Sequence, residues 1–202
     1  HAFGVNHCDR SVLAYGDAST LSFHATKLFH TIEGGAVVFR NKTDYIKAKE
    51  LINFGLDNSG KLVRTGINGK LNEYQCAVGL SNFKQIENIL SKRQEIYHTY
   101  FQGLKNIVGL QLWQGESTHN GSYLPILLKD EQEKIKVMKH LYNNDIQCRE
   151  YFSPALNTVF RPDEKMPIAE SVSKRILCLP LHFNLTHQEV QKVCRAVENS
   201  LV

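Results

Sequence analysis

The chain has 202 residues and a formal net charge of +4, which is long enough to bury one good core, or a partial domain together with a smaller one. The charge is spread along the chain, and no basic run alternates with aromatic residues, which argues against a nucleic-acid-binding surface. We expect no signal peptide, and no apolar run approaches the roughly 20 residues that span a bilayer. We therefore expect a soluble cytoplasmic protein that binds neither nucleic acid nor membrane.

The five cysteines are widely scattered and never form a C-x-x-C pair, so the sequence predicts neither a zinc site nor a disulfide framework. The histidines show no metal-ligand spacing. We expect reduced thiols, several of them buried as small apolar side chains, and no bound metal.

Apolar periodicity predicts short strands alternating with helices. Residues 2–18 are interpreted as a strand end and a loop, and four glycines between residues 53 and 70 indicate a mobile loop. The expected strands cover about residues 21–24, 35–39, 110–113, 123–128, 146–148 and 175–179. The expected helices cover about residues 43–51, 72–90, 92–104, 131–142 and 187–201, the first capped by Thr43 or Asp44 and the last opened by a Thr186/Glu189 capping box.

The most informative stretch is S-F-H-A-T-K at residues 22–27, followed by E-G-G-A at 33–36. It places a lysine just past a short strand and a glycine pair before the next strand. An amine at a strand end suits imine chemistry with a carbonyl, and the glycines would let a ligand approach the backbone. A surface lysine in an ordinary loop is the alternative, and spacing alone favours it.

Further motifs raise a resemblance that covers nearly the whole chain in order. They are H-A-F-G at 1–4, G-I-N-G-K-L-N-E at 66–73, A-V-G-L at 77–80, Y-F-S-P at 151–154 and L-C-L-P-L at 177–181. Together with residues 22–36, these motifs resemble the DegT/DnrJ/EryC1/StrS family of sugar-nucleotide aminotransferases. The resemblance implies an α/β fold, the pyridoxal 5'-phosphate (PLP) transferase fold type I. It also implies an incomplete PLP-binding large domain at residues 1–90 and a small C-terminal α/β domain at residues 91–202.

By this resemblance, Lys27 is the catalytic lysine that holds PLP. Ser22 is expected to bind the cofactor phosphate, and His1 to lie beside the cofactor ring. Asn68 is expected to reach the PLP phosphate of a second copy, which implies a homodimer with shared active sites. A strand-end role for Ser22 and a turn role for Asn68 are the alternatives from the residues alone.

Three further residues are candidate substrate contacts by the same resemblance. Glu33 is expected either to face the sugar or to set the turn. Arg149 and Tyr151 lie in the small-domain segment near the substrate, and a structural or solvated role is equally compatible with their positions.

The implied reaction is amino transfer from an amino acid, glutamate by expectation, to a keto group of a nucleotide-linked sugar. The A-T-K…E-G-G-A wording resembles the branch that aminates C-4 of 4-keto-6-deoxyhexoses, typified by dTDP-4-amino-4,6-dideoxyglucose transaminases. A C-3 aminotransferase is the first alternative. Because the family's N-terminal half does not precede residue 1, the second alternative is an inactive fragment that only dimerises.

Overall fold

The computed structural model describes residues 1–202, and the chain divides into two compact units. Unit 1 contains residues 1–88 together with 114–120, and unit 2 contains residues 89–113 and 121–202. We expected a single boundary at residue 90, whereas residues 114–120 belong to unit 1 although they follow a stretch of unit 2.

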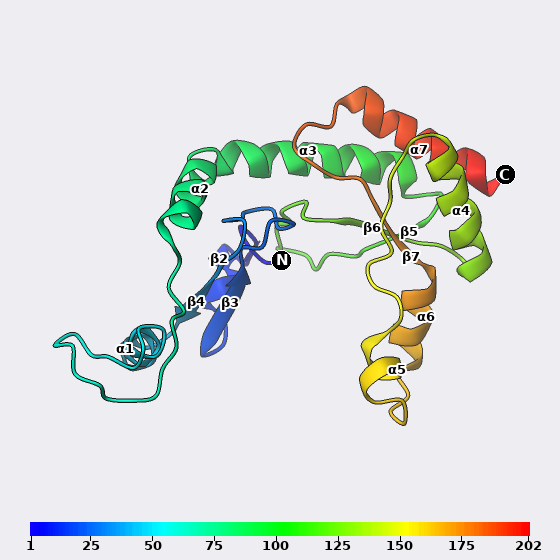
Figure 1. Ribbon diagram of the computed structural model, residues 1–202. Coiled ribbons are helices and arrows are strands. Elements are labelled where there is room, and N and C mark those ends of the chain that lie inside the picture. Colours follow the sequence, from blue (N-terminus) through cyan, green and yellow to red (C-terminus); the bar gives the residue numbers. More distant parts are fainter. The chain divides into compact units, whose positions relative to one another are not determined.

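Unit 1 is built from two hairpins and two helices (Figure 1). Its elements are β1 (Asn6–His7), β2 (Arg10–Ser11), the 3-10 turn η1 (Val12–Ala14), β3 (Ala18–Ser22), β4 (Gly35–Phe39), α1 (Lys42–Leu51), α2 (Glu73–Phe83) and the first turn of α3 (Ile86–Leu104). The antiparallel β1–β2 hairpin occupies a stretch that we interpreted as loop. β3 and β4 pair antiparallel from Ala18 opposite Phe39 to Ser22 opposite Gly35, so β3 starts and ends earlier than predicted.

The helices of unit 1 begin at asparagine caps. Asn41 caps α1 by accepting from the backbone N–H of Asp44, so the expected caps Thr43 and Asp44 are wrong. Asn72 forms a capping box with Gln75 at the start of α2. α2 ends at Phe83 and α3 begins at Ile86, so the break between the two helices comes earlier than the predicted break near residue 91.

The glycine-rich segment after α1 is folded back on the end of that helix. The backbone N–H of Ile67 donates to Leu51 O at 2.8 Å, and the N–H of Phe54 donates to Ile67 O at 2.9 Å. Gly55 and Gly66 pack so closely that a Cβ on either one would collide with backbone atoms. The glycines therefore serve the close approach of two segments of this loop.

Unit 2 is a three-stranded antiparallel sheet covered by helices. Its strands β5 (Gly109–Leu110), β6 (Leu124–Leu127) and β7 (Ile176–Leu179) lie in the order β5-β6-β7. Its helices are α3 from Ile89 onward, α4 (Glu131–Asn143), α5 (Leu156–Phe160), α6 (Pro167–Arg175) and α7 (His187–Leu201). α5 and α6 were not predicted. The strand expected at residues 146–148 is absent, and a single bridge pairs Arg149 with Cys178 instead.

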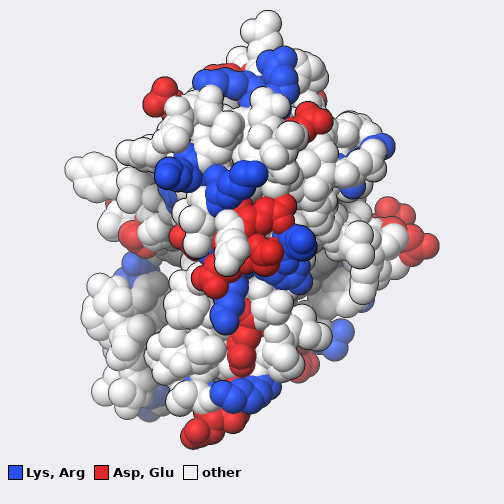
Figure 2. All heavy atoms as spheres, turned by 90° about the vertical axis from the view of Figure 1, so that its right-hand side faces the viewer, with Lys and Arg blue, Asp and Glu red and all other residues white.

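The core of unit 2 forms where the sheet meets α3, α4 and α7. Tyr100, Leu141 and Leu177 are fully buried there, one each from α3, α4 and β7. The predicted Thr186/Glu189 capping box of α7 is confirmed. On the face drawn in Figure 2, acidic and basic side chains lie intermixed. None of the helices combines the length and the apolar character that crossing a bilayer requires.

Candidate functional site

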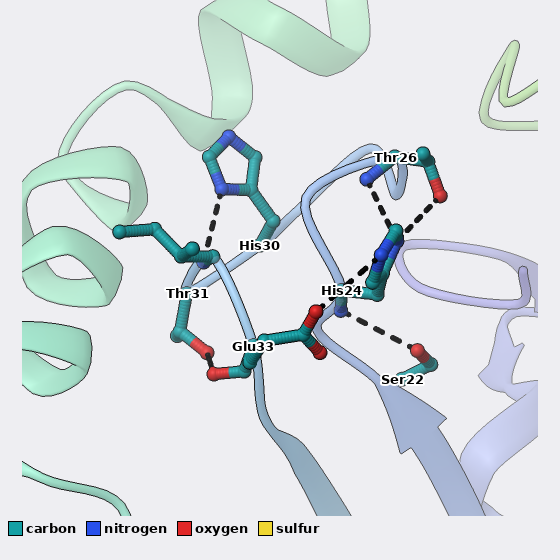
Figure 3. Close-up of polar contacts among 7 residues, drawn as sticks. Ser22, His24, Thr26, His30, Thr31 and Glu33 are labelled. Atoms are coloured by element: carbon teal, nitrogen blue, oxygen red, sulfur yellow. Dashed lines mark hydrogen bonds and ion pairs between the residues drawn. The ribbon is translucent and has the colours of Figure 1, made fainter.

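The loop between β3 and β4 is closed at its base by backbone hydrogen bonds. The N–H of Phe23 donates to Gly34 O at 2.8 Å, and the N–H of Thr31 donates to Phe23 O at 2.9 Å. The buried hydroxyl of Thr31 donates to Glu33 O at 2.7 Å, as Figure 3 shows. These bonds hold the two ends of the loop together, so the residues between them are presented on a fixed base.

An aromatic cluster anchors the middle of this loop. The ring of Phe29 stacks on Phe3 at 4.9 Å and meets Phe23 and Phe83 edge-on at 4.9 and 6.0 Å between centroids. Phe29 is the one large apolar side chain of unit 1 that is buried. The loop therefore packs against the start of the chain and the end of α2.

The glycine pair after the loop is explained by contacts within the protein. Gly34 has φ +149°, and a Cβ there would press on Leu71 at 2.7 Å. A Cβ on Gly35 would lie 2.7 Å from Leu21 O across the hairpin. These glycines therefore allow tight packing at the loop base, rather than the approach of a ligand to the backbone that we expected.

Lys27 lies two residues before the buried ring of Phe29, and the loop turns there because its N–H donates to His24 O at 2.9 Å. Its Nζ is 3.3 Å from Nε2 of His1. The side chain is partly buried and forms no ion pair with a carboxylate. The structure thus brings together two of the predicted site residues, an amine and an imidazole.

Ser22 and Glu33 each contact His24, for which the sequence did not predict a role. The hydroxyl of Ser22 accepts from the N–H of His24 at 3.4 Å, and Nδ1 of His24 accepts from the N–H of Thr26 at 3.2 Å. Because Nδ1 is an acceptor, the ring proton lies on Nε2, which faces the Glu33 carboxylate at 3.5 Å (Figure 3). Glu33 therefore has a partner inside its own loop.

His1 is held by a residue that sequence reasoning missed. The side-chain amide of Asn120 donates to His1 O at 2.8 Å and to Phe3 O at 2.7 Å. Asn120 is in the segment that returns to unit 1, and nothing in the local sequence around it signals this contact.

Asn68 is not joined to the other predicted site residues of unit 1. It is exposed, pairs through its backbone with Asn53, and its side chain makes no hydrogen bond within the chain. Exposed apolar side chains lie beside it in sequence, among them Ile67 at 68% exposure. Its neighbour Lys70 donates to Asn53 Oδ1 at 2.8 Å and lies over the Phe54 ring.

Arg149 and Tyr151 belong to unit 2, where they contact each other. The guanidinium of Arg149 donates to the Tyr151 hydroxyl at 2.5 Å, and Tyr151 meets Tyr123 edge-on at 5.7 Å. Burial is the main reason that the pKa of Tyr123 is raised above its ordinary value. The buried amine of Lys134 donates to Glu150 and so fixes the chain between the two candidates.

The structure groups no three His, Cys, Asp or Glu side chains that could hold a metal ion. The five cysteines are free thiols. Burial raises the pKa of the Cys178 and Cys194 thiols to about 11, so both stay protonated at neutral pH.

Comparison with known proteins identifies relatives along the whole chain. The chain is 34% identical to a dTDP-4-amino-4,6-dideoxy-D-glucose transaminase of Shigella dysenteriae over 98% of its own length and 56% of the relative's. It is 29% identical to a UDP-4-amino-4,6-dideoxy-N-acetyl-beta-L-altrosamine transaminase of Helicobacter pylori over 98% of the chain and 56% of the relative. The chain therefore spans about half the length of the curated relatives it matches.

Solved structures agree on the fold. The protein Spr1654 of Streptococcus pneumoniae, solved in a pyridoxamine phosphate (PMP) form and a PLP form, superposes with TM-scores of 0.89 and 0.86. Identity is 19% and 18%, and the match covers 99% of this chain and 55% of that one. The mixed helix and sheet fold is thus that of PLP-dependent aminotransferases. The model of the DegT/DnrJ/EryC1/StrS aminotransferase family matches residues 1–198, and the chain belongs to this family.

Proposed function

We propose that the protein containing this chain is a PLP-dependent aminotransferase. It transfers an amino group from an amino acid, glutamate, to the C-4 keto group of a nucleotide-linked 4-keto-6-deoxyhexose. Membership of the family supports the reaction class, and the names of the two curated relatives support position 4 of the sugar. The observation that carries the proposal is the amine of Lys27, held 3.3 Å from an imidazole on a loop with a closed base.

The side chains around this loop fit the cofactor by their chemistry. A primary amine without a carboxylate partner suits an aldehyde, and a hydroxyl at a strand end suits a phosphate oxygen. Lys27 and Ser22 supply these groups from one loop and the strand before it. Lys27 would hold the aldehyde carbon, Ser22 would donate to the phosphate, and His1 would lie beside the ring.

PLP, when bound, supplies a ring that withdraws electrons and makes a proton on the amino-bearing carbon labile. The Lys27 amine is the group of this chain that would take that proton and return one to the carbon that receives nitrogen. The His1 imidazole would orient the amine, since its Nε2 accepts from Nζ in the tautomer that leaves Nε2 unprotonated.

We infer that the segment around Asn68 completes the site of a second copy of the chain. An exposed carboxamide without a hydrogen-bond partner, flanked by exposed apolar side chains, suits an interface. Asn68 would donate to the partner's cofactor phosphate, which makes the homodimer the working form. Residues 1–90 would then be part of the cofactor-binding large domain and residues 91–202 the small domain, in a cytoplasmic enzyme.

The substrate contacts are proposed for Glu33, Arg149 and Tyr151. Arg149 donates to a phenol rather than to an acid, so its remaining N–H groups are available to an anionic substrate group. Glu33 would accept from sugar hydroxyls in addition to facing His24.

The test is Lys27→Ala in the intact protein, assayed with glutamate and a dTDP-4-keto-6-deoxyhexose. Amino transfer should fall by roughly 10³-fold or more, because the proposed proton carrier is removed. Lys61→Ala is the matched control, since Lys61 is exposed and lies in a surface turn. NMR of the product should show nitrogen at C-4. Substantial turnover by the Lys27 variant would contradict the catalytic role of Lys27. Nitrogen at C-3 of the product would instead indicate a C-3 aminotransferase.

A further inference from the structure

Asn120 belongs to unit 1 and has a buried amide side chain. It is 3% exposed, and its Nδ2 donates both to His1 O and to Phe3 O, at 2.8 and 2.7 Å. An amide nitrogen has two protons, so both of its donors are directed to one short segment. Buried polar groups are costly unless they are paired, so this arrangement strongly fixes the backbone of residues 1–3.

The segment that carries Asn120 is itself tied to the β1–β2 hairpin. The N–H of Thr118 donates to Asn6 O, and the N–H of Asn6 donates to Thr118 Oγ1, both at 2.9 Å. Ser117 Oγ lies 2.8 Å from Nδ1 of His7. Residues 114–120 are therefore held to the β1–β2 hairpin by these contacts, although both neighbouring stretches of chain belong to unit 2.

Residues 1–3 are fixed at a second point by an aromatic stack. The Phe3 ring stacks on Phe29 with 4.9 Å between centroids and 7° between planes. Phe29 is in the same loop as Lys27, so the stack and the Asn120 amide together determine where residues 1–3 lie against that loop. As a result, Nε2 of His1 lies 3.3 Å from Nζ of Lys27.

We propose that Asn120 is a positioning residue that holds the His1 imidazole against the Lys27 amine. This inference rests on the proposed function, because it gives the pair a role in the reaction of Lys27. Asn120 acts through the backbone of residues 1–3, and His1 transmits the effect to the amine. A buried amide that only satisfied two carbonyl groups would stabilise unit 1 without affecting the amine.

A double-mutant cycle separates these two roles. The variants are Asn120→Ala, His1→Ala and the double variant in the intact protein, with Asn120→Asp as an isosteric second variant. Asn157→Ala is the matched control, because the amide of Asn157 also donates twice, to Glu164 O and to Glu170 Oε1, but in unit 2. The first readout is the rate at which trinitrobenzenesulfonate labels Lys27 in cofactor-free protein, followed by peptide mapping. The second is the division of the loss between kcat and KM.

We expect Asn120→Ala and His1→Ala each to slow the labelling of Lys27 by roughly fivefold, a size usual for coupled neighbours. The double variant should be no slower than His1→Ala alone, since nothing remains to be positioned. The same variants should lower kcat with little change in the KM of the sugar, whereas Asn157→Ala should match the unchanged protein in both readouts.

An effect of Asn120→Ala that persists in the His1→Ala background overturns the positioning role, as does an unchanged labelling rate in both Asn120 variants. Failure of the proposed function is a distinct result, namely turnover that survives Lys27→Ala. The labelling cycle does not depend on that turnover.

Discussion

The two units of this chain differ in what holds them together. Unit 2 contains the whole cluster of seventeen buried apolar residues, contributed by helices and strands that pack on one another. Unit 1 buries one large apolar side chain, Phe29, and depends on hairpin pairing, helix caps and buried polar groups such as Thr31 and Asn120. The candidate lysine is in the unit that lacks a core.

The apolar side chains of unit 1 lie on its surface. Leu80 of α2 is 68% exposed and Tyr74 is 85% exposed, although both follow the helical periodicity of a buried face. Large exposed apolar surfaces are typical of contacts with other chains or segments. Unit 2 is therefore stabilised from within, whereas unit 1 has apolar faces that these 202 residues do not cover.

The largest expected difference between the units is in the cost of removing a leucine. Leu177→Ala, at a fully buried position in β7, should lower the free energy of unfolding by about 2–5 kcal/mol. Leu80→Ala in α2 should change the free energy of unfolding of the 202-residue chain by less than about 0.5 kcal/mol, because Leu80 is 68% exposed there. Urea unfolding followed by far-UV circular dichroism measures both, and Trp113 fluorescence reports on unit 2. Equal losses would contradict the contrast between the units.

A smaller effect tests the few tight contacts of unit 1. A Cβ at Gly79 would lie 2.8 Å from Cγ2 of the buried Thr31, so Gly79→Ala should cost about 1–3 kcal/mol by overpacking. Gly115→Ala is the control, because no atom lies within 4 Å of its added Cβ. If the two substitutions have the same effect in thermal unfolding, the packing of α2 against the lysine loop is not as described.

The smallest effect concerns the start of α7 in unit 2. Thr186→Ala removes the cap and should cost about 1 kcal/mol. The N–H and hydroxyl of Thr186 lower the pKa of Glu189 from its usual 4.5. Because the pKa of Glu189 is lower in the folded state, its ionised carboxylate stabilises the fold at pH values above the pKa of the unfolded chain. This stabilisation is lost as the pH falls below about 4.5. The free energy of unfolding between pH 3 and 6 should therefore depend less on pH in the variant. An unchanged pH dependence would contradict the role of Thr186 as the cap.

Much of the fold could be predicted because its signals are local. The strand at Gly35–Phe39 and the capped helix α7 have both periodicity and boundary residues in the sequence. The β1–β2 hairpin and the five-residue helix α5 were missed because each is too short to show a period. The helix α6 was missed because Ile168 and Val172 are its only strongly apolar side chains. The early break between α2 and α3 was missed because the apolar pattern continues through it, without a glycine or proline between Phe83 and Ile86.

The candidate site divides in the same way. Lys27 and Ser22 stand in a contiguous motif, so the sequence identifies them as candidates. The contact between His1 and Lys27, and its support by Asn120, joins residues that are far apart in the sequence. No pattern of spacing encodes such a contact. Periodicity likewise showed that Leu80 belongs to an apolar face, but not that this face stays exposed.

Cofactor binding by Lys27 can be tested in one measurement. The intact protein is incubated with PLP, reduced with borohydride, and digested for peptide mass mapping. We expect a phosphopyridoxyl group on Lys27, absent from the Lys27→Ala variant and unaffected by Lys61→Ala. A protein labelled only on other lysines, or not at all, would contradict the assignment of this loop as the cofactor site.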